Sequence, residues 1–264
     1  MSKPADSNVT ATASGMPATR VLDVPISLIN MREAITTTLS WIEGGQAHYV
    51  CVRDVHGVMR AQEAPDLLEI HNGAGMVTPD GMPLVWLARW RGHSHVTRVC
   101  GADLVAALCE VSVERGISHY FYGGKPGVAE RMAKALIAQF PGLRVAGFGT
   151  PPFGTISEEE DAIATQMIAA ALPGVVWVGL STPKQEYWMR NHVGRIPGAT
   201  LIGVGAAFDF YAGDVKRAPK WMQHRGREWL HRLASEPRRL WRRYLVLSPK
   251  FVLSVARRGF GRGT

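Results

Sequence analysis

The amino-acid sequence predicts an α/β fold, with a Rossmann-like core of parallel strands covered by helices on both faces and a basic helical appendage at the C-terminal end. In residues 20–213, short apolar runs rich in β-branched and aromatic residues alternate with stretches of helical periodicity, as in parallel sheets with right-handed crossovers. After residue 213, apolar side chains recur at three- and four-residue spacing between arginines. We therefore expect a core at 20–213 and an appendage at 214–264.

Residues 1–19 are expected to form a disordered tail. They contain one lysine among Ala, Ser, Thr and Pro residues and offer little to bury. The segment lacks the apolar stretch of a secretory signal. The chain of 264 residues also has no apolar run of the length, roughly 18 residues, that predicts a membrane-spanning helix.

The elements of the core follow from the spacing of apolar residues. Apolar runs of strand length are found at 20–24, 48–53, 76–78, 119–122, 144–148, 175–178 and 200–204. Helices are expected at 30–43, 83–91, 102–115, 128–140, 158–171 and 184–192. The appendage should contain at least two helices, because Pro237 interrupts its apolar periodicity.

Positive charge is concentrated in the appendage. The chain has a net charge of +8, yet residues 216–264 contain 14 Lys and Arg against two Glu, and the remainder is slightly acidic. This asymmetry indicates a polyanionic partner: nucleic acid, anionic lipid or the phosphate groups of a substrate. The three cysteines form no CxxC pair and stand in apolar stretches, so reduced buried thiols are expected rather than a zinc site.

A glycine-rich turn at residues 123–127 follows a predicted strand and precedes a predicted helix. The backbone N–H groups of such a turn, together with the helix dipole, can bind a phosphate, so Gly123 and Gly124 are candidate ligand contacts. Pro126 stands where a Walker A loop needs Ser or Thr, and the turn is not a GxGxxG fingerprint. A structural role, in which glycine permits a tight turn, is equally compatible.

Asp80 ends a short predicted strand and precedes a helix. A carboxylate at the carboxyl end of a parallel strand lies where α/β sheets place their ligand crevice, so Asp80 is a candidate general base. The alternative is a turn or helix-capping role, because Pro-Asp-Gly is a common turn sequence.

Two further loops carry polar side chains after predicted strands. Lys184, Gln185 and Glu186 begin a helix and are able to bind hydroxyl and phosphate groups. Asp209 lies in an otherwise apolar run and needs a partner, either a ligand base or ribose hydroxyl or a local backbone N–H. The sequence has no D-x-D triplet, so a metal-bridged diphosphate is not indicated.

Taken together, these motifs resemble the WecG/TagA/CpsF family of glycosyltransferases over nearly the whole chain after about residue 20. The pieces in register are Pro79-Asp80-Gly81 with Trp86, Gly101-x-Asp103-Leu104, the turn that begins at Phe121, Pro183-Lys184-Gln185-Glu186, Gly205-Ala206-Ala207-Phe208-Asp209-Phe210-x-Ala212-Gly213, Arg217-Ala218-Pro219, Glu228-Trp229-Leu230-x-Arg232-Leu233, and Glu236-Pro237-x-Arg239-Leu240-x-Arg242-Arg243-Tyr244. The variants at 54–59 and 151–153 are similar to the branch associated with exopolysaccharide synthesis.

The resemblance implies an inverting hexosyltransferase, similar to the N-acetylmannosaminyltransferases, that acts without a metal or other cofactor. It implies a UDP-sugar donor, a polyprenyl-diphosphate-linked acceptor, and peripheral attachment of the appendage to the cytoplasmic face of the membrane. Asp80 aligns with the proposed base, Gln185 with a residue near donor and acceptor, and Asp209 with a nucleoside contact. Arginines and helix N-termini would then meet the charge of the leaving diphosphate; the remaining candidate substrate contacts are Phe153, Lys184, Arg217, Arg232 and Arg239.

Two segments depart from the family pattern. Where the family often has Thr-x-Asn after the second strand, this chain has Val52 and Asp54, so a carboxylate replaces an amide near the expected acceptor site. Asp54 is therefore a second catalytic candidate, sharing the base role or contacting the substrate. Arg227 stands where the family usually has Leu, which leaves the packing of that helix open.

Other functions remain as alternatives at this stage. A nicotinamide-dependent oxidoreductase would need a GxGxxG after an early strand, which the sequence lacks. A nucleic-acid-binding protein would explain the basic helices but not the acidic core, so no nucleic-acid partner is expected. A relative that has lost activity is compatible with the changes at Val52 and Asp54, whereas the intact Asp80 argues against it. The oligomeric state, including a homo-oligomer, is left open.

Overall fold

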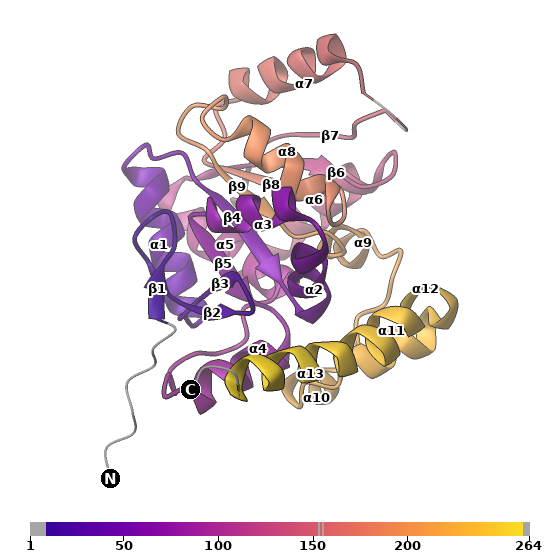
Figure 1. Ribbon diagram of the computed structural model, residues 1–264. Helices are drawn as coiled ribbons and strands as arrows, with labels where there is room; N and C mark the ends of the chain where they lie inside the picture. The colour runs from indigo at the N-terminus through magenta and orange to yellow at the C-terminus, as the bar shows by residue number, and fades with distance from the viewer. Residues whose placement is uncertain (1–8, 153, 155, 261–264) are drawn as a thin grey trace.

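The computed structural model describes residues 9–152, 154 and 156–260. Its centre is a parallel sheet of six strands in the order β5-β4-β9-β8-β6-β7 (Figure 1). The strands are β4 Tyr49–Arg53, β5 Met76–Pro79, β6 Ser118–Gly123, β7 Arg144–Gly149, β8 Val175–Gly179 and β9 Thr200–Gly203. Each coincides with a predicted strand, so the predicted parallel core is confirmed.

The core strands are apolar because both faces of the sheet are buried. Successive side chains of a strand point to opposite faces. Cys51 and Val178 accordingly join one apolar cluster, whereas Val50 and Trp177 join the other. The polar residues of these segments are therefore found mainly where the strands end.

Helices cover both faces of the sheet, as predicted. One face packs against α1 Met31–Glu43, α5 Gly101–Arg115, α6 Val128–Gln139 and α9 Ala207–Tyr211. The other packs against α2 Val55–Glu63, α3 Pro65–Asn72, α7 Glu158–Ala170 and α8 Lys184–His192. The helix α4 Met82–Trp90 follows β5 and lies at the lower end of the molecule in Figure 1.

The N-terminal segment requires a correction. Instead of a tail up to residue 19 and a parallel strand at 20–24, the chain forms a separate antiparallel sheet of β1 Val9–Ala11, β2 Pro17–Val21 and β3 Val24–Ser27. Thr12 is buried and its Oγ1 donates to the Gly75 carbonyl at 2.8 Å, while Ala18 is fully buried. These small side chains find partners far along the chain, which the composition of the segment does not reveal. Residues 1–8 lie outside the described part.

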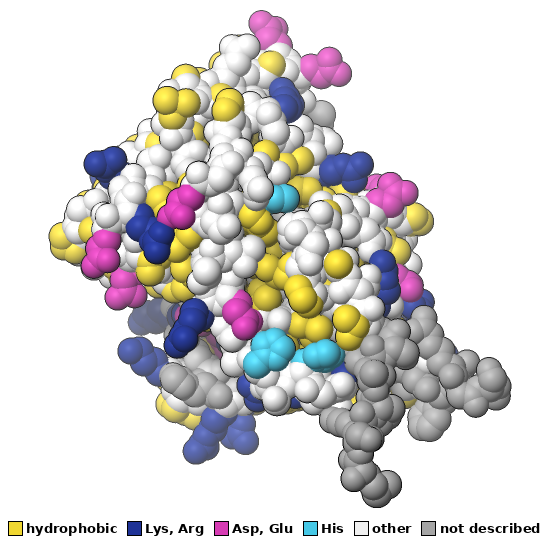
Figure 2. Space-filling view, turned by 90° about the vertical axis from the view of Figure 1, so that its left-hand side faces the viewer, with side chains coloured by type: hydrophobic (Ala, Val, Ile, Leu, Met, Phe, Trp, Pro, Cys, Tyr) yellow, Lys and Arg dark blue, Asp and Glu magenta, His cyan; other side chains and the backbone are white. Residues whose placement is uncertain are grey.

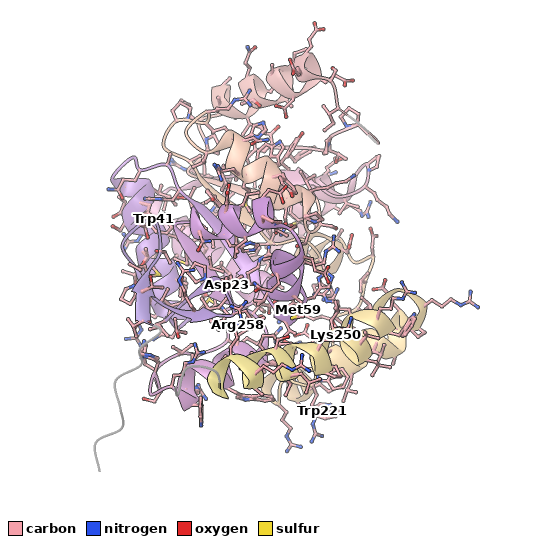
Figure 3. All side chains as sticks on the ribbon, viewed as in Figure 1. Asp23, Trp41, Met59, Trp221, Lys250 and Arg258 are labelled. Atoms are coloured by element: carbon pink, nitrogen blue, oxygen red, sulfur yellow. The ribbon has the colours of Figure 1, made fainter. Side chains whose placement is uncertain are left out.

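The C-terminal appendage is a series of helices that packs on the core. It comprises α10 Lys220–His224, α11 Glu228–Ser235, α12 Pro237–Trp241, the π-helical turn η1 Arg242–Val246 and α13 Leu247–Phe260. Pro237 begins α12, which confirms the predicted break. Leu240 and Phe251 are buried, and α13 lies beside α2 with Arg258 Nη1 2.6 Å from Asp23 Oδ1 (Figure 3). Among the described helices, none is long and apolar enough to cross a membrane.

The turn after β6 depends on glycine. Gly123 has a φ of 135°, and a Cβ there would lie 2.6 Å from the carbonyl carbon and oxygen of Gly179. We predict that Gly123→Ala lowers the free energy of unfolding by about 2–4 kcal/mol in urea denaturation. Gly213→Ala is the control, because its φ of 82° is also left-handed but its Cβ would have nothing within 4 Å. The control should lose only about 1 kcal/mol, and equal losses would contradict the steric explanation.

Candidate active site

Polar residues gather at the carboxyl ends of the parallel strands. Asp54 follows β4, Asp80 follows β5, Gly124 follows β6, Gln185 lies in the first turn of α8 after β8, and Asp209 lies in α9 after β9. Because the strands are parallel, these ends share one edge of the sheet, where α/β proteins bind ligands. The structure thus brings the residues predicted from separate motifs to one edge.

Asp80 is held by Arg98. Its Oδ1 accepts hydrogen bonds from Arg98 Nη2 at 2.9 Å and from Arg98 Nε at 3.2 Å. The N-cap of α4 is Gly81 and no side chain caps that helix, so the carboxylate of Asp80 is not used for capping. Burial raises the pKa of the Asp80 carboxyl above its ordinary value, and the Arg98 charge offsets part of that rise. This combination suits a general base.

Arg98 connects Asp80 to the appendage. Its Nη1 donates to Glu228 Oε2 at 2.9 Å, and Glu228 Oε1 accepts from Arg217 Nε at 3.2 Å. Arg217 Nη1 in turn donates to Asp103 Oδ1 at 2.5 Å. Three carboxylates and two guanidinium groups thus alternate from the end of β5 to α5 and α11. Arg217, predicted as a substrate contact, is engaged by this network.

Asp54 forms an ion pair with Arg243 of the appendage. It is the N-cap of α2, where its Oδ1 accepts from the Gly57 N–H at 3.0 Å, and its Oδ2 accepts from Arg243 Nη2 at 2.5 Å. Burial alone would raise the pKa of the Asp54 carboxyl, but Arg243 and these hydrogen bonds hold it well below its ordinary value. A carboxylate with a low pKa and both oxygens bonded is a weaker base than Asp80.

The two acidic turns touch each other. The Asp80 N–H donates to the Arg53 carbonyl at 2.8 Å, and a Cβ added at Gly81 would lie 3.3 Å from the Asp54 Cα. Because β4 and β5 are neighbours in the sheet, Asp54 and Asp80 belong to one site.

Gln185 lies over the end of β9, close to β4. Its Nε2 donates to Glu186 Oε1 at 2.9 Å, and Glu186 forms a buried ion pair with Arg53, the last residue of β4. A Cβ added at Gly203 would lie 2.9 Å from Gln185 Nε2, so the glycine makes room for the amide. The site therefore extends from Asp80 past Asp54 to Gln185, across the ends of β5, β4 and β9.

The glycine turn after β6 packs against neighbouring elements. The Gly124 N–H donates to the Gly179 carbonyl at 3.0 Å, and a Cβ added at Gly124 would lie 2.7 Å from Val128 Cγ1. A Cβ added at Gly179 would lie 2.5 Å from the Phe208 ring. The Gly124 N–H is therefore bonded within the protein, and the role of this turn as a phosphate cradle stays a prediction.

The other predicted contacts are more dispersed. Lys184 is exposed at the start of α8, and Asp209 is partly buried in α9. Arg232 places its guanidinium carbon 5.6 Å from the centre of the Phe210 ring. Among the described residues, the buried Arg232 Nε has no hydrogen-bond partner. Phe153 lies outside the described residues, as does the side chain of Arg239, whose backbone belongs to α12.

A basic groove opens beside this site. It has a volume of about 530 Å³ and lies between α2, the loop before α8 and the C-terminal helices. Its lining includes His56, Arg60, Arg242 and Lys250, together with Glu63 and Thr182. Positive side chains around a groove favour a ligand that carries phosphate groups.

The structure also bears on metal and thiol chemistry. Within the described stretches of the chain, no three His, Cys, Asp or Glu side chains are grouped as metal ligands. The three cysteines are free and buried, as expected. Cys100 Sγ donates to Asp103 Oδ2 at 2.9 Å, and burial raises the pKa of the thiol, so it is a structural group.

Comparison with known proteins identifies the family of this chain. A family model described as "Glycosyl transferase WecG/TagA/CpsF family" matches residues 19–264. The chain belongs to this family of glycosyltransferases. It is therefore an enzyme that transfers a glycosyl group, which favours this function over the nicotinamide-dependent and nucleic-acid-binding alternatives.

Two relatives of this glycosyltransferase have the same name. The chain is 30% identical over 190 residues to the N-acetylglucosaminyldiphosphoundecaprenol N-acetyl-beta-D-mannosaminyltransferase of Bacillus subtilis (strain 168), with 72% of each chain covered. It is also 30% identical over 195 residues to the protein of that name from Bacillus spizizenii, with 74% of this chain and 73% of the relative covered.

The contacts of three residues of this glycosyltransferase site were not foreseen from the sequence. Glu228 and Arg243 lie inside the quoted motifs, whereas Arg98 lies in a loop outside them. One signal for Glu228 was available, since it is one of two acids among the residues from 216 to 264. An acid retained in such a basic segment and buried in the structure indicates a specific partner.

We predict that Asp54→Asn loosens the appendage of the glycosyltransferase. Arg243 would keep its position but lose its charge partner, so opening of α12 and η1 should become easier by about 1–3 kcal/mol. Hydrogen exchange of those amides measures the change. The control is Asp23→Asn, which removes the exposed ion pair with Arg258 and should cost less than about 1 kcal/mol. Equal effects of the two substitutions would contradict a special role for the Asp54 contact.

Proposed function

We propose that this glycosyltransferase moves a sugar from a UDP-sugar to a polyprenyl-diphosphate-linked saccharide, with inversion and with Asp80 as the base. N-acetylmannosamine is the first candidate sugar, because both relatives are named as transferring it to N-acetylglucosaminyldiphosphoundecaprenol. The observation that carries the proposal is the Asp80 carboxylate, which lies at the ligand-binding edge of the sheet and is held by Arg98 without capping a helix. Extracellular polysaccharide is the polymer we expect the product to enter.

The proposed reaction forms one bond and breaks one. An acceptor hydroxyl oxygen attacks the anomeric carbon of the donor, and the bond from that carbon to the UDP phosphate oxygen breaks. Asp80 takes the hydroxyl proton as the new bond forms, a contribution of about 10²- to 10⁴-fold in rate. The raised pKa of Asp80 makes its carboxylate a stronger proton acceptor than an exposed aspartate.

The leaving UDP needs positive charge. Arg232, whose Nε lacks a partner among the described residues, and the exposed Lys184 are supplied by two elements at this edge of the sheet. The basic groove adds Arg242 and Lys250. Guanidinium and ammonium groups directed at a diphosphate can stabilise the charge that develops on it.

We also propose that the lower end of the molecule rests on the membrane. Trp90 of α4 is 74% exposed, Trp221 of α10 is 56% exposed and Val252 of α13 is 62% exposed. Gly226 packs against Met82, so α10 and α4 are neighbours. Lys and Arg side chains gather at this end of the face in Figure 2, and Trp221 lies at the same end in Figure 3. Exposed tryptophan beside basic residues is typical of proteins that bind anionic lipid surfaces.

A donor screen tests the proposed activity. The wild-type protein is incubated with a panel of UDP-sugars, a short-chain polyprenyl-diphosphate N-acetylglucosamine and EDTA, and UDP release is measured. Acceptor-dependent release from UDP-N-acetylmannosamine is the expected result and would also support metal independence. No acceptor-dependent release from any UDP-sugar by the folded protein would contradict the proposal.

For the base, we predict that Asp80→Asn lowers kcat by roughly 10²- to 10⁴-fold while UDP affinity changes by less than about threefold. The neutral amide keeps the shape of the side chain but accepts no proton. Turnover and UDP binding by calorimetry measure the two quantities. Asp66→Asn, which alters an exposed carboxylate bonded to Tyr187, serves as a control and should retain wild-type turnover. Near-normal turnover of Asp80→Asn would show that another group is the base.

For the membrane surface, we predict that replacing Trp90 and Trp221 together by serine weakens binding to vesicles with anionic phospholipid by roughly tenfold or more. Truncation of the appendage is a poorer test, because Leu240 and Phe251 are part of the buried interior. Met167→Ser on α7, at the opposite end of the molecule and 63% exposed, is the matched control. Equal losses in vesicle sedimentation for the two proteins would refute the assigned surface.

A further inference from the structure

The side chain of Gln185 is buried and leaves one oxygen unpaired. It is 3% exposed, and its Oε1 has no hydrogen-bond partner among the described residues, although its Nε2 donates to Glu186. A buried acceptor without a partner is unfavourable, and native proteins retain few of them. The orphaned oxygen therefore needs an explanation, and it lies at the edge of the sheet that holds Asp54 and Asp80.

Glu186 determines the orientation of the Gln185 side-chain amide. Its Oε1 accepts from Gln185 Nε2 at 2.9 Å and from Thr182 Oγ1 at 3.2 Å, and Arg53 Nη2 donates to the same oxygen. A carboxylate only accepts hydrogen bonds, so turning the amide over would place two acceptor oxygens against each other. The Nε2 group is therefore fixed toward Glu186 and the Oε1 atom toward the other side.

The buried Gln185 Oε1 atom faces a glycine turn. A Cβ added at Gly205 would lie 3.5 Å from Gln185 Oε1, and Gly205 is the turn residue between β9 and α9. Glycine at this position leaves the space next to the oxygen free of a side chain. The helix that follows, α9, carries Asp209, and β4, the strand paired with β9, is followed directly by Asp54. The oxygen is thus placed among the groups assigned to substrate.

We propose that Glu186, held by Arg53, is a positioning residue that presents Gln185 Oε1 as the acceptor for an O–H or acetamido N–H group of the sugar being transferred. This inference rests on the proposed function. An oxygen that is desolvated in advance discriminates strongly, because a sugar that lacks the donor group leaves it unpaired. Gln185 then contributes to selectivity for the sugar, and the Arg53–Glu186 pair determines whether it can do so.

The test compares sugars that differ by one hydrogen-bond donor. The probes are UDP-N-acetylmannosamine, its 3-, 4- and 6-deoxy analogues and the analogue in which the acetamido N–H is replaced by an ester oxygen. For each, kcat/KM is measured with polyprenyl-diphosphate N-acetylglucosamine as acceptor. In the wild type, one analogue should lose roughly 10²-fold or more relative to the parent sugar.

Two variants remove the positioning without removing Gln185. Arg53→Met with Glu186→Leu replaces the buried ion pair by apolar side chains of similar size, a change that folded proteins often tolerate. Gly203→Ala should displace the Gln185 amide, because the new Cβ would lie 2.9 Å from Gln185 Nε2. The new Cβ would also approach the terminal methyl of Met189, which is flexible enough to move away. Tyr187→Phe, on the same helix but directed at Asp66, is the matched control.

The expected result is a change in discrimination rather than a uniform loss. In both variants, kcat/KM for the parent sugar should exceed kcat/KM for the sensitive analogue by only about threefold or less. In Tyr187→Phe this ratio should stay at the wild-type value. Equal ratios in wild type and both variants would overturn the inference while leaving the proposed function intact. No turnover of any probe by the wild type would overturn the proposed function and this inference together.

Discussion

The bridge from Glu228 through Arg98 to Asp80 is the interaction on which the site depends. It joins a carboxylate of the appendage to the candidate base at the end of β5, through an arginine that bonds to both. Glu228 is buried and Asp80 is partly buried, with side chains 9% and 29% exposed, so the guanidinium between them offsets the cost of removing their charges from water. The position of α11 and the protonation of Asp80 are therefore coupled by one side chain.

The appendage consequently has two roles at once. Its inner side completes the site, because Glu228 and Arg243 reach the turns that carry Asp80 and Asp54, and Phe251 is packed into the core. Its outer side exposes tryptophan and basic residues suited to a lipid surface. The proposed lipid-linked acceptor would give a physical reason for building both roles into the same helices, since the helices that complete the site would then also contact the membrane.

The sequence predicted what local patterns determine, and the remainder depends on contacts between distant residues. Most of the core strands were identifiable because burial on both faces makes them largely apolar, whereas the edge strand β7 is partly exposed. Asp80 and Gln185 were identifiable because they follow such strands. The antiparallel strands of the N-terminal segment were missed, since small polar residues such as Thr12 become buried only against partners much later in the chain. The bond between Asp54 and Arg243 spans 189 residues, so no local pattern could indicate it. The orientation of the Gln185 amide in α8 likewise depends on Glu186, which is bonded to Arg53 of β4.

The dependence of kcat/KM on pH in charge variants of the bridge tests the account most directly. As the proposed base, Asp80 has to be deprotonated, so activity should fall as the pH drops through its pKa, which burial raises and Arg98 lowers. The Glu228 charge also raises that pKa. Glu228→Gln should therefore move the acid limb to lower pH, and Arg98→Gln should move it to higher pH. Opposite shifts would confirm that the appendage is docked on the base through Arg98, whereas an unshifted acid limb in Glu228→Gln would contradict it.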